Sequence, residues 1–120
     1  MADRKMQRKD RTELLNAVFA AIADATRRSI LDRLREQPLT VTELAAPYRM
    51  SLNAVSKHIK TLEAAGLLCR EIRGREHSCR LNASRMEEAM TWMSDYTEFW
   101  SARMEALDEH LSAKRKRERR

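Results

Sequence analysis

The chain has 120 residues, of which 42% are hydrophobic, 35% charged and 5% aromatic, and its formal net charge is +6. This length fits one domain, and because the sequence holds two glycines and two prolines we expect a mainly α fold with an aliphatic, methionine-rich core. The charged N-terminus argues against a signal peptide, and no apolar run is long enough to cross a membrane. We therefore expect a cytoplasmic protein whose two cysteines are free thiols.

The charges are unevenly distributed along the chain. Residues 26–80 hold eleven basic and six acidic side chains, and residues 114–120 hold six basic and one acidic. Residues 81–113 are acidic instead, with seven carboxylates against two arginines. This asymmetry favours a polyanionic partner at one face of the molecule rather than nonspecific attraction all round.

Two helices are predicted in the first third of the chain. Residues 1–11 carry charges without periodicity, and we expect a flexible basic arm there. From Thr12 onward, apolar residues recur at helical spacing and include Leu15 and Phe19. Asp24 then stands where it can cap a second helix over residues 25–37. The expected core face of that helix comprises Ile30, Leu31 and Leu34.

A shorter helical pattern follows Pro38. Residues 39–41 are too short for an independent element but could form a small strand. Thr42 is a suitable N-cap for a third helix. The segment Pro47–Met50 then reads as a turn that leads into a longer helix.

The stretch from Met50 to Leu67 is predicted to be one helix with a marked start and end. Ser51 can accept hydrogen bonds from its first amides, and Gly66 stands where a helix ends in the left-handed conformation. Val55, Ile59 and Leu62 line one face, whereas the other face carries Asn53, Ser56, Lys57, Lys60 and Thr61. A helix that enters the DNA major groove needs this division, because short polar groups read base edges and cations hold phosphates. With the preceding short helix, it predicts a helix-turn-helix.

After Gly66 the pattern changes to that of a β-hairpin. We expect its two central turn residues to be Arg73 and Gly74, which places Ile72 opposite Arg75 and Leu68 opposite Cys79. The hairpin is then a basic wing, suited to phosphates or to the minor groove, with Arg73, Arg75 and His77 near its end. In this register Cys69 and Cys79 lie on opposite faces of the hairpin. A thiol switch therefore stays a minor alternative.

The last helix is predicted to start at Asn82 or Ser84 and to run to about Ala113. Its apolar residues alternate in steps of four and three, which is a heptad seam; they are Met86, Met90, Met93, Trp100, Met104, Leu107 and Leu111, with Thr97 as the one polar interruption. Three short helices are too small to cover this seam, so we expect a second copy to cover it. Residues 114–120 form a basic tail.

No group of residues supports enzymatic chemistry or a bound cofactor. His58 lies at the edge of an apolar stripe and is more simply a structural or phosphate-side histidine. Asp108 and His110 could offer two metal ligands, but two ligands do not make a site. Four aromatic side chains of the last helix could line an effector pocket, although core or dimer packing is the simpler use; they are Trp92, Tyr96, Phe99 and Trp100.

Three blocks in this order give the chain a family resemblance: FAAIADATRRSIL at 19–31, VTELA at 41–45 and SLNAVSKHIKTLEAAGL at 51–67. Over residues 14–112 the chain resembles the ArsR (ArsR/SmtB) family of winged helix-turn-helix bacterial transcriptional regulators. The resemblance implies a homodimer with the first and last helices at its interface, repressing transcription from a palindromic operator. It also implies an effector, of unknown identity, that can release the DNA.

The sequence departs from the metal-sensing members of that family. Where they carry a Cys-Val-Cys type of motif, this chain has ELAAP at 43–47, and residues 95–97 lack the histidine of their last helix. The chain thus resembles a subgroup without the metal-site motifs, and no metal ligands are expected.

The sequence therefore predicts a winged helix-turn-helix domain over residues 12–113 that binds double-stranded DNA and dimerises. The expected DNA contacts are Ser51, Asn53, Ser56, Lys57, Lys60, Arg73, Arg75 and His77. The expected dimer interface comprises Leu15, Phe19, Met90, Met93, Trp100, Met104 and Leu107. Two alternatives stay open: a thiol- or metal-responsive sensor of the same fold, and a protein-interaction module that uses the long last helix.

Overall fold

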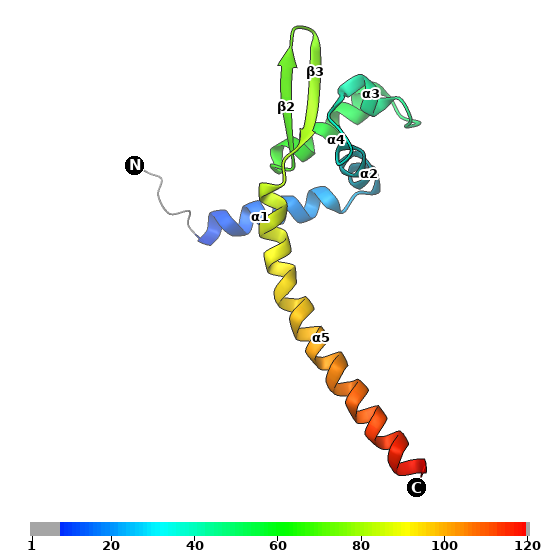
Figure 1. Ribbon diagram of the computed structural model, residues 1–120. Helices are drawn as coiled ribbons and strands as arrows, with labels where there is room; N and C mark the ends of the chain where they lie inside the picture. Colours follow the sequence, from blue (N-terminus) through cyan, green and yellow to red (C-terminus); the bar gives the residue numbers. More distant parts are fainter. Residues whose placement is uncertain (1–7, 120) are drawn as a thin grey trace. The chain divides into compact units, whose positions relative to one another are not determined.

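The computed structural model describes residues 8–119 of the chain, and it is mainly helical with one small sheet (Figure 1). The described chain forms two units, one up to Ala89 and one from Met90 onward. The elements in order are α1 (Arg8–Ile22), α2 (Ala25–Leu34), β1 (Leu39–Thr40), α3 (Val41–Ala45), α4 (Leu52–Ala64), β2 (Leu68–Arg73), β3 (Glu76–Leu81) and α5 (Ser84–Arg119).

The first two helices differ from the prediction only at their ends. Helix α1 begins at Arg8 rather than at Thr12, so residues 8–11 belong to a helix. The remainder of the expected flexible arm lies outside the described residues. Helix α2 begins after Asp24, whose carboxylate accepts from the Arg27 amide at 2.9 Å, as an N-cap does. The helix ends at Leu34, three residues before the expected end.

The third helix begins earlier than predicted because Thr40, not Thr42, is its N-cap. The Thr40 hydroxyl accepts from the Glu43 amide at 3.1 Å, and the Glu43 carboxylate accepts from the Thr40 amide at 2.8 Å. This reciprocal pair is a capping box. Just before it, β1 is the two-residue strand that the sequence allowed, and it pairs with β3.

Helix α4 has the limits that its sequence signals indicate. The Ser51 hydroxyl accepts from the Ala54 amide at 3.0 Å. At the other end Gly66 has a φ of +78°, which a residue with a side chain rarely adopts. A methyl group in place of its hydrogen would also lie 2.6 Å from the Arg85 side chain. Glycine is therefore required here for two reasons.

The turn of the wing is displaced by one residue from the prediction. Arg73 faces Glu76, so the central turn residues are Gly74 and Arg75, and the predicted turn at Arg73–Gly74 is wrong. Gly74 has a φ of +64°, while no other residue type among those described has a positive φ. A glycine at the first central position, followed by a residue with negative φ, is the pattern of a type II′ turn.

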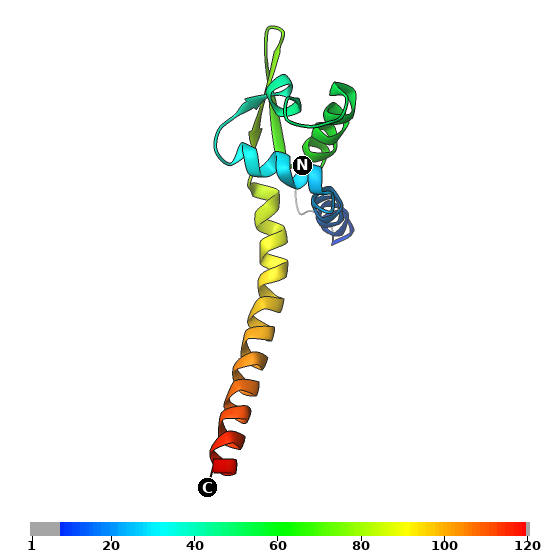
Figure 2. The ribbon, with the colours of Figure 1, turned by 90° about the vertical axis from the view of Figure 1, so that its right-hand side faces the viewer.

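The change of turn shifts the pairing of the two strands. Leu68 faces Leu81 instead of Cys79, and Ile72 faces His77 instead of Arg75. Together with β1 the strands form a sheet in the order β1-β3-β2. The hairpin of β2 and β3 projects beyond the helices of this unit, as the two views of Figure 1 and Figure 2 show.

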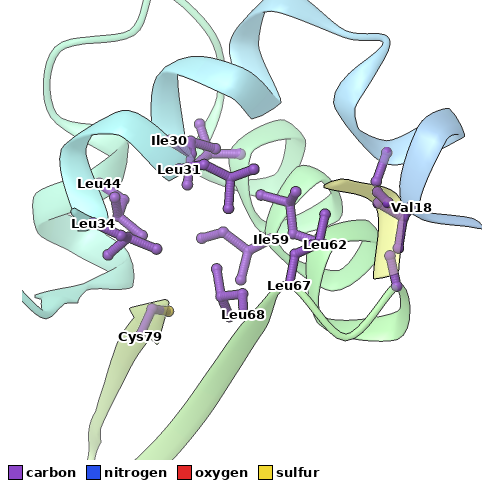
Figure 3. Close-up of a cluster of buried hydrophobic side chains, with 14 residues drawn as sticks. Val18, Ile30, Leu31, Leu34, Leu44, Ile59, Leu62, Leu67, Leu68 and Cys79 are labelled. Carbon is purple, nitrogen blue, oxygen red and sulfur yellow. The ribbon is translucent and has the colours of Figure 1, made fainter. Parts of the chain in front are cut away.

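The core of the first unit is aliphatic. Side chains from α2, α4 and β2 point toward one another, and Cys79 of β3 closes one edge (Figure 3). Val55, Ile59 and Leu62, the predicted buried face of α4, are each inaccessible to solvent. The predicted core face of α2 is buried as well. Burying these side chains on one side of α4 leaves its opposite side exposed.

The second unit consists of α5 from Met90 onward. The helix continues to Arg119, so the basic segment 114–119 is helical rather than a separate tail. Its apolar seam is exposed to solvent: the exposed fractions of Met90, Met93, Trp100, Met104 and Leu107 lie between 38% and 62%. A seam of large apolar side chains in water indicates an interaction surface.

Candidate nucleic-acid interface

The exposed side of α4 carries the residues that the sequence singles out for DNA. Ser51, Asn53, Lys57 and Lys60 are exposed, and Ser56 is half-buried. Because residues three and four apart share a face of a helix, Asn53, Lys57 and Lys60 form one row. This row combines a short amide at the start of the helix with two ammonium groups further along.

The wing stands beside the start of α4 and encloses a hollow with it. The hollow is lined from α4 by Leu52 and Ser56, from the wing by Arg70, Arg75, Glu76 and His77, and from the segment around α3 by residues 40–43. At the end of the wing, Arg73 and Arg75 are both exposed. The hollow therefore brings Ser56 of α4 together with Arg75 and His77 of the wing.

Helix α4 is tied to the start of α2 through His58. Its Nδ1 lies 3.1 Å from Arg27 Nη1 and 3.9 Å from a carboxylate oxygen of Asp24. The Arg27 amide that donates to Asp24 lowers the pKa of that carboxyl, and the charge of His58 acts in the same direction. His58 is thus a structural histidine, as the sequence suggested, and it is directed away from the exposed row.

Three arginines that the sequence did not single out fix the helices around α4. Arg27 and Arg28 donate to the carbonyls of the last turn of α1, including a 2.8 Å bond from Arg28 to Ile22. Arg33 donates to the carbonyls of Glu43 and Leu44 at 2.9 and 2.8 Å. They satisfy carbonyls that a helix end leaves unpaired. Each arginine belongs to a different helix from the one it caps, and the local spacing of residues in the sequence therefore did not indicate these contacts.

Arg70, a largely covered side chain of the wing, links the wing to α4. Arg70 of β2 lies 3.4 Å from the Glu63 carboxylate of α4, and its Nη1 lies 3.3 Å from His77 Nδ1 of β3. The Arg70 side chain is 13% exposed. His77, predicted to contact DNA, is therefore half-buried and held in place by Arg70 rather than free at the end of the wing.

The two cysteines remain on opposite faces of the hairpin, because the shift of the register by two positions keeps the same residues on each face. Cys79 is inaccessible to solvent, and its burial raises the pKa of its thiol despite the nearby Arg70 charge. A reactive cysteine needs access and a lowered pKa. This geometry gives the thiol-sensor alternative no support.

Among the residues that the structure describes, no three His, Cys, Asp or Glu side chains are grouped so as to hold a metal ion. Within the same range, no helix has an apolar stretch of the length and hydropathy that a bilayer span requires.

Comparison with known proteins decides the family. A family model described as a helix-turn-helix domain matches residues 22–71. The HTH-type transcriptional regulator Rv2034 of Mycobacterium tuberculosis is 38% identical over 83 residues, which cover 69% of this chain and 75% of that protein. The transcriptional repressor SdpR of Bacillus subtilis is 30% identical over 68% of this chain and 91% of its own length. The crystal structure of the ArsR family regulator RHA00566 is 36% identical, with a TM-score of 0.70 over 84% of this chain and 97% of that one.

The chain belongs to the ArsR family of transcriptional regulators. It is accordingly a DNA-binding winged helix-turn-helix regulator and not an enzyme. The fold alone is also shared with the solution structure of Mb0332 from Mycobacterium bovis, which is 21% identical with a TM-score of 0.62 over 82% of this chain and 92% of that one. That fragment is described as a homodimeric winged helix-turn-helix DNA-binding domain of a possible ArsR-family regulator.

Proposed function

We propose that this ArsR-family protein is a homodimeric repressor that binds a palindromic operator through α4 and the wing. The observation that carries the proposal is the hollow in which Ser56 of α4 meets Arg75 of the wing, next to the exposed polar row of α4. An action on promoters would place the protein in the cytoplasm with the chromosome.

Each part of this surface has a distinct task in the proposal. Asn53 and Ser56, near the start of α4, have the short polar groups that read base edges in the major groove. Lys57 and Lys60 lie further along the helix and would hold phosphates, as would the exposed Ser51 hydroxyl. Beside the helix, the wing would reach the flanking backbone or the minor groove with Arg73, Arg75 and His77.

The dimer in the proposal is built on the exposed seam of α5, whose side chains from Met90 to Leu107 face solvent in a single copy. Leu15 and Phe19 of α1 are half-buried against the core and would contribute their remaining surface. Two copies related by a two-fold axis would present two α4 helices about 34 Å apart, one turn of DNA. The homodimeric state described for Mb0332 supports this arrangement.

Two-fold symmetry is also the reason to expect a palindromic operator. The repressor activity named for the relative SdpR supports repression as the outcome of binding. An effector of unknown identity would act by rotating the subunits, because the spacing of the two α4 helices depends on the dimer geometry.

The test is fluorescence anisotropy with the full-length protein. Its operator is first selected from a random duplex library, and binding is then compared with a scrambled duplex at physiological salt. We expect a preference of about a thousandfold or more. The variant Ser56→Glu should abolish operator binding, because a carboxylate facing the DNA repels phosphates.

The matched control is Ser112→Glu, which adds the same charge to the second unit. It should leave operator binding within about two-fold of the wild type, because Ser112 is exposed and is not one of the proposed DNA contacts. Equal binding of the wild type to both duplexes would overturn the proposal, as would an unchanged affinity of a correctly folded Ser56→Glu variant.

A further inference from the structure

Exposed large apolar side chains are few in the first unit, and two of the three flank the N-cap of α4. Among the described residues up to Ala89, the large hydrophobic residues that are exposed are Met50 at 36%, Leu52 at 56% and Ile72 at 63%. Met50 and Leu52 flank Ser51 at the start of α4, and Ile72 lies in the wing. Hydrophobic side chains at these positions leave apolar area in water, which is unfavourable in the free protein.

Leu52 lies at the border between the buried stripe of α4 and the proposed base-reading face, three residues before Val55 and one turn before Ser56. It is the first residue of α4, and it shares one row with Ser56 and Lys60 because residues four apart lie above one another on a helix. Leu52 and Ser56 also line the same hollow between α4 and the wing. Its polar neighbours on the helix are those assigned above to base edges and phosphates.

The fold gives no structural reason for a leucine at this position. The buried face of α4 is complete without it, since Val55, Ile59 and Leu62 are each inaccessible to solvent. The cap of the helix is made by Ser51 and the Ala54 amide, and the side chain of Leu52 takes no part in it. The apolar side chain of Leu52 is therefore better explained by a contact with the molecule that α4 binds.

We infer that Leu52 is a specificity-determining residue that packs against the 5-methyl group of a thymine in each half-site. This inference rests on the proposed binding of α4 in the major groove. Thymine is the one base that presents a methyl group there, and apolar side chains recognise it by contact. Arg75 lines the same hollow and Lys60 shares the row of Leu52, and these cations favour DNA over an apolar protein surface as the occupant.

The experiment removes the methyl group from the DNA instead of the side chain alone. In the selected operator, each thymidine is replaced in turn by deoxyuridine, which pairs identically but lacks the methyl. Affinities are measured by anisotropy for the wild type, for Leu52→Ala and for the matched control Ile72→Ala. Both variants truncate an exposed aliphatic side chain, but Ile72 lies outside α4.

We expect one thymine position per half-site at which the wild type loses about four-fold in affinity on deoxyuridine, the change expected for leaving one methyl group in water. With both half-sites changed the loss should be about fifteen-fold. Leu52→Ala should bind both duplexes equally, and Ile72→Ala should keep the wild-type ratio.

Four results would overturn the inference. If the wild type binds its operator specifically but tolerates deoxyuridine at every position, Leu52 does not read a methyl group while the proposed function stands. If Leu52→Ala still distinguishes the two duplexes, Leu52 likewise does not read the methyl group. If Leu52→Ala changes the mass measured by sedimentation, Leu52 belongs to a protein interface instead. If the wild type shows no operator preference at all, the inference falls together with the proposed function.

Discussion

The Glu63 carboxylate lies 3.4 Å from the Arg70 guanidinium and joins the last turn of α4 to the wing. This contact does not satisfy the guanidinium fully, because Nε and Nη2 of Arg70 are buried without a hydrogen-bond partner. At 41% exposure, the Glu63 side chain keeps contact with water. Taking the Arg70 guanidinium out of water therefore costs free energy, and its ion pair and hydrogen bonding offset that cost only in part.

Replacing Arg70 by methionine should therefore not destabilise the protein. We expect the free energy of unfolding of Arg70→Met to equal that of the wild type or to exceed it by up to about 1 kcal/mol, because the apolar stem is kept and the buried charge is removed. Arg70→Ala, which also removes the stem, should lose roughly 2 kcal/mol. Urea denaturation followed by circular dichroism measures both. A methionine variant as unstable as the alanine variant would show that the ion pair itself is stabilising.

The N-cap of α4 offers a second stability test. Ser51→Ala removes the acceptor of the Ala54 amide and should lower the free energy of unfolding by about 1 kcal/mol. Ser112→Ala, an exposed serine within α5, is the control and should change stability by less than about 0.5 kcal/mol. Equal urea midpoints for both variants would mean that the cap contributes nothing measurable.

Local signals in the sequence were sufficient for most of the helix ends. Asp24, Ser51 and Gly66 were assigned correctly, because a cap depends on residues only a few positions away. The missed cap at Thr40 had a signal as well, since Glu43 follows three residues later as a capping box requires. The sequence did not fix the position of the turn in the wing, because a lone glycine fits either central position of a two-residue turn. Only the pairing of the two strands shows which position the glycine occupies.

The binding surface was predictable in part. The polar row of α4 follows directly from helical spacing, so Asn53 and Lys57 could be named from the sequence. The link from Arg70 to His77 depends on the true strand register. Leu52 lies three and seven residues before Val55 and Ile59, so helical spacing would place it in the buried stripe, yet it is 56% exposed. Neither could be derived before the tertiary structure was known.

Two capping carboxylates should make stability depend on pH in the acid range. Hydrogen bonds from the Arg27 amide to Asp24 and from the Thr40 amide to Glu43 lower the pKa of both carboxyls below their ordinary values of 3.8 and 4.5. A depressed pKa in the folded state means that the stabilisation is present above the unfolded pKa and is lost as the pH falls through the folded pKa. The urea midpoint should therefore fall as the pH is lowered from 5 toward 2, an interval set roughly by these values.

The control keeps the hydrogen bonds but removes the titration. Asparagine is as good an N-cap as aspartate, and glutamine can complete a capping box. The double variant Asp24→Asn, Glu43→Gln should accordingly show a smaller fall of the midpoint over the same pH range. An acid transition identical to that of the wild type would assign the pH dependence to other carboxylates.

The exposed seam of α5 can be tested as the dimer interface. Trp100 is 59% exposed in a single copy, and in a dimer built on the seam a charge at this position would be buried in an apolar interface. Trp100→Asp should raise the dissociation constant of the dimer by at least about a hundredfold. Ala102→Asp adds the same charge two residues on, about 200° around the helix, and should leave the dimer intact. Sedimentation equilibrium distinguishes these outcomes: equal weakening by both variants, or a wild type that is monomeric at micromolar concentration, would exclude the seam as the dimer interface.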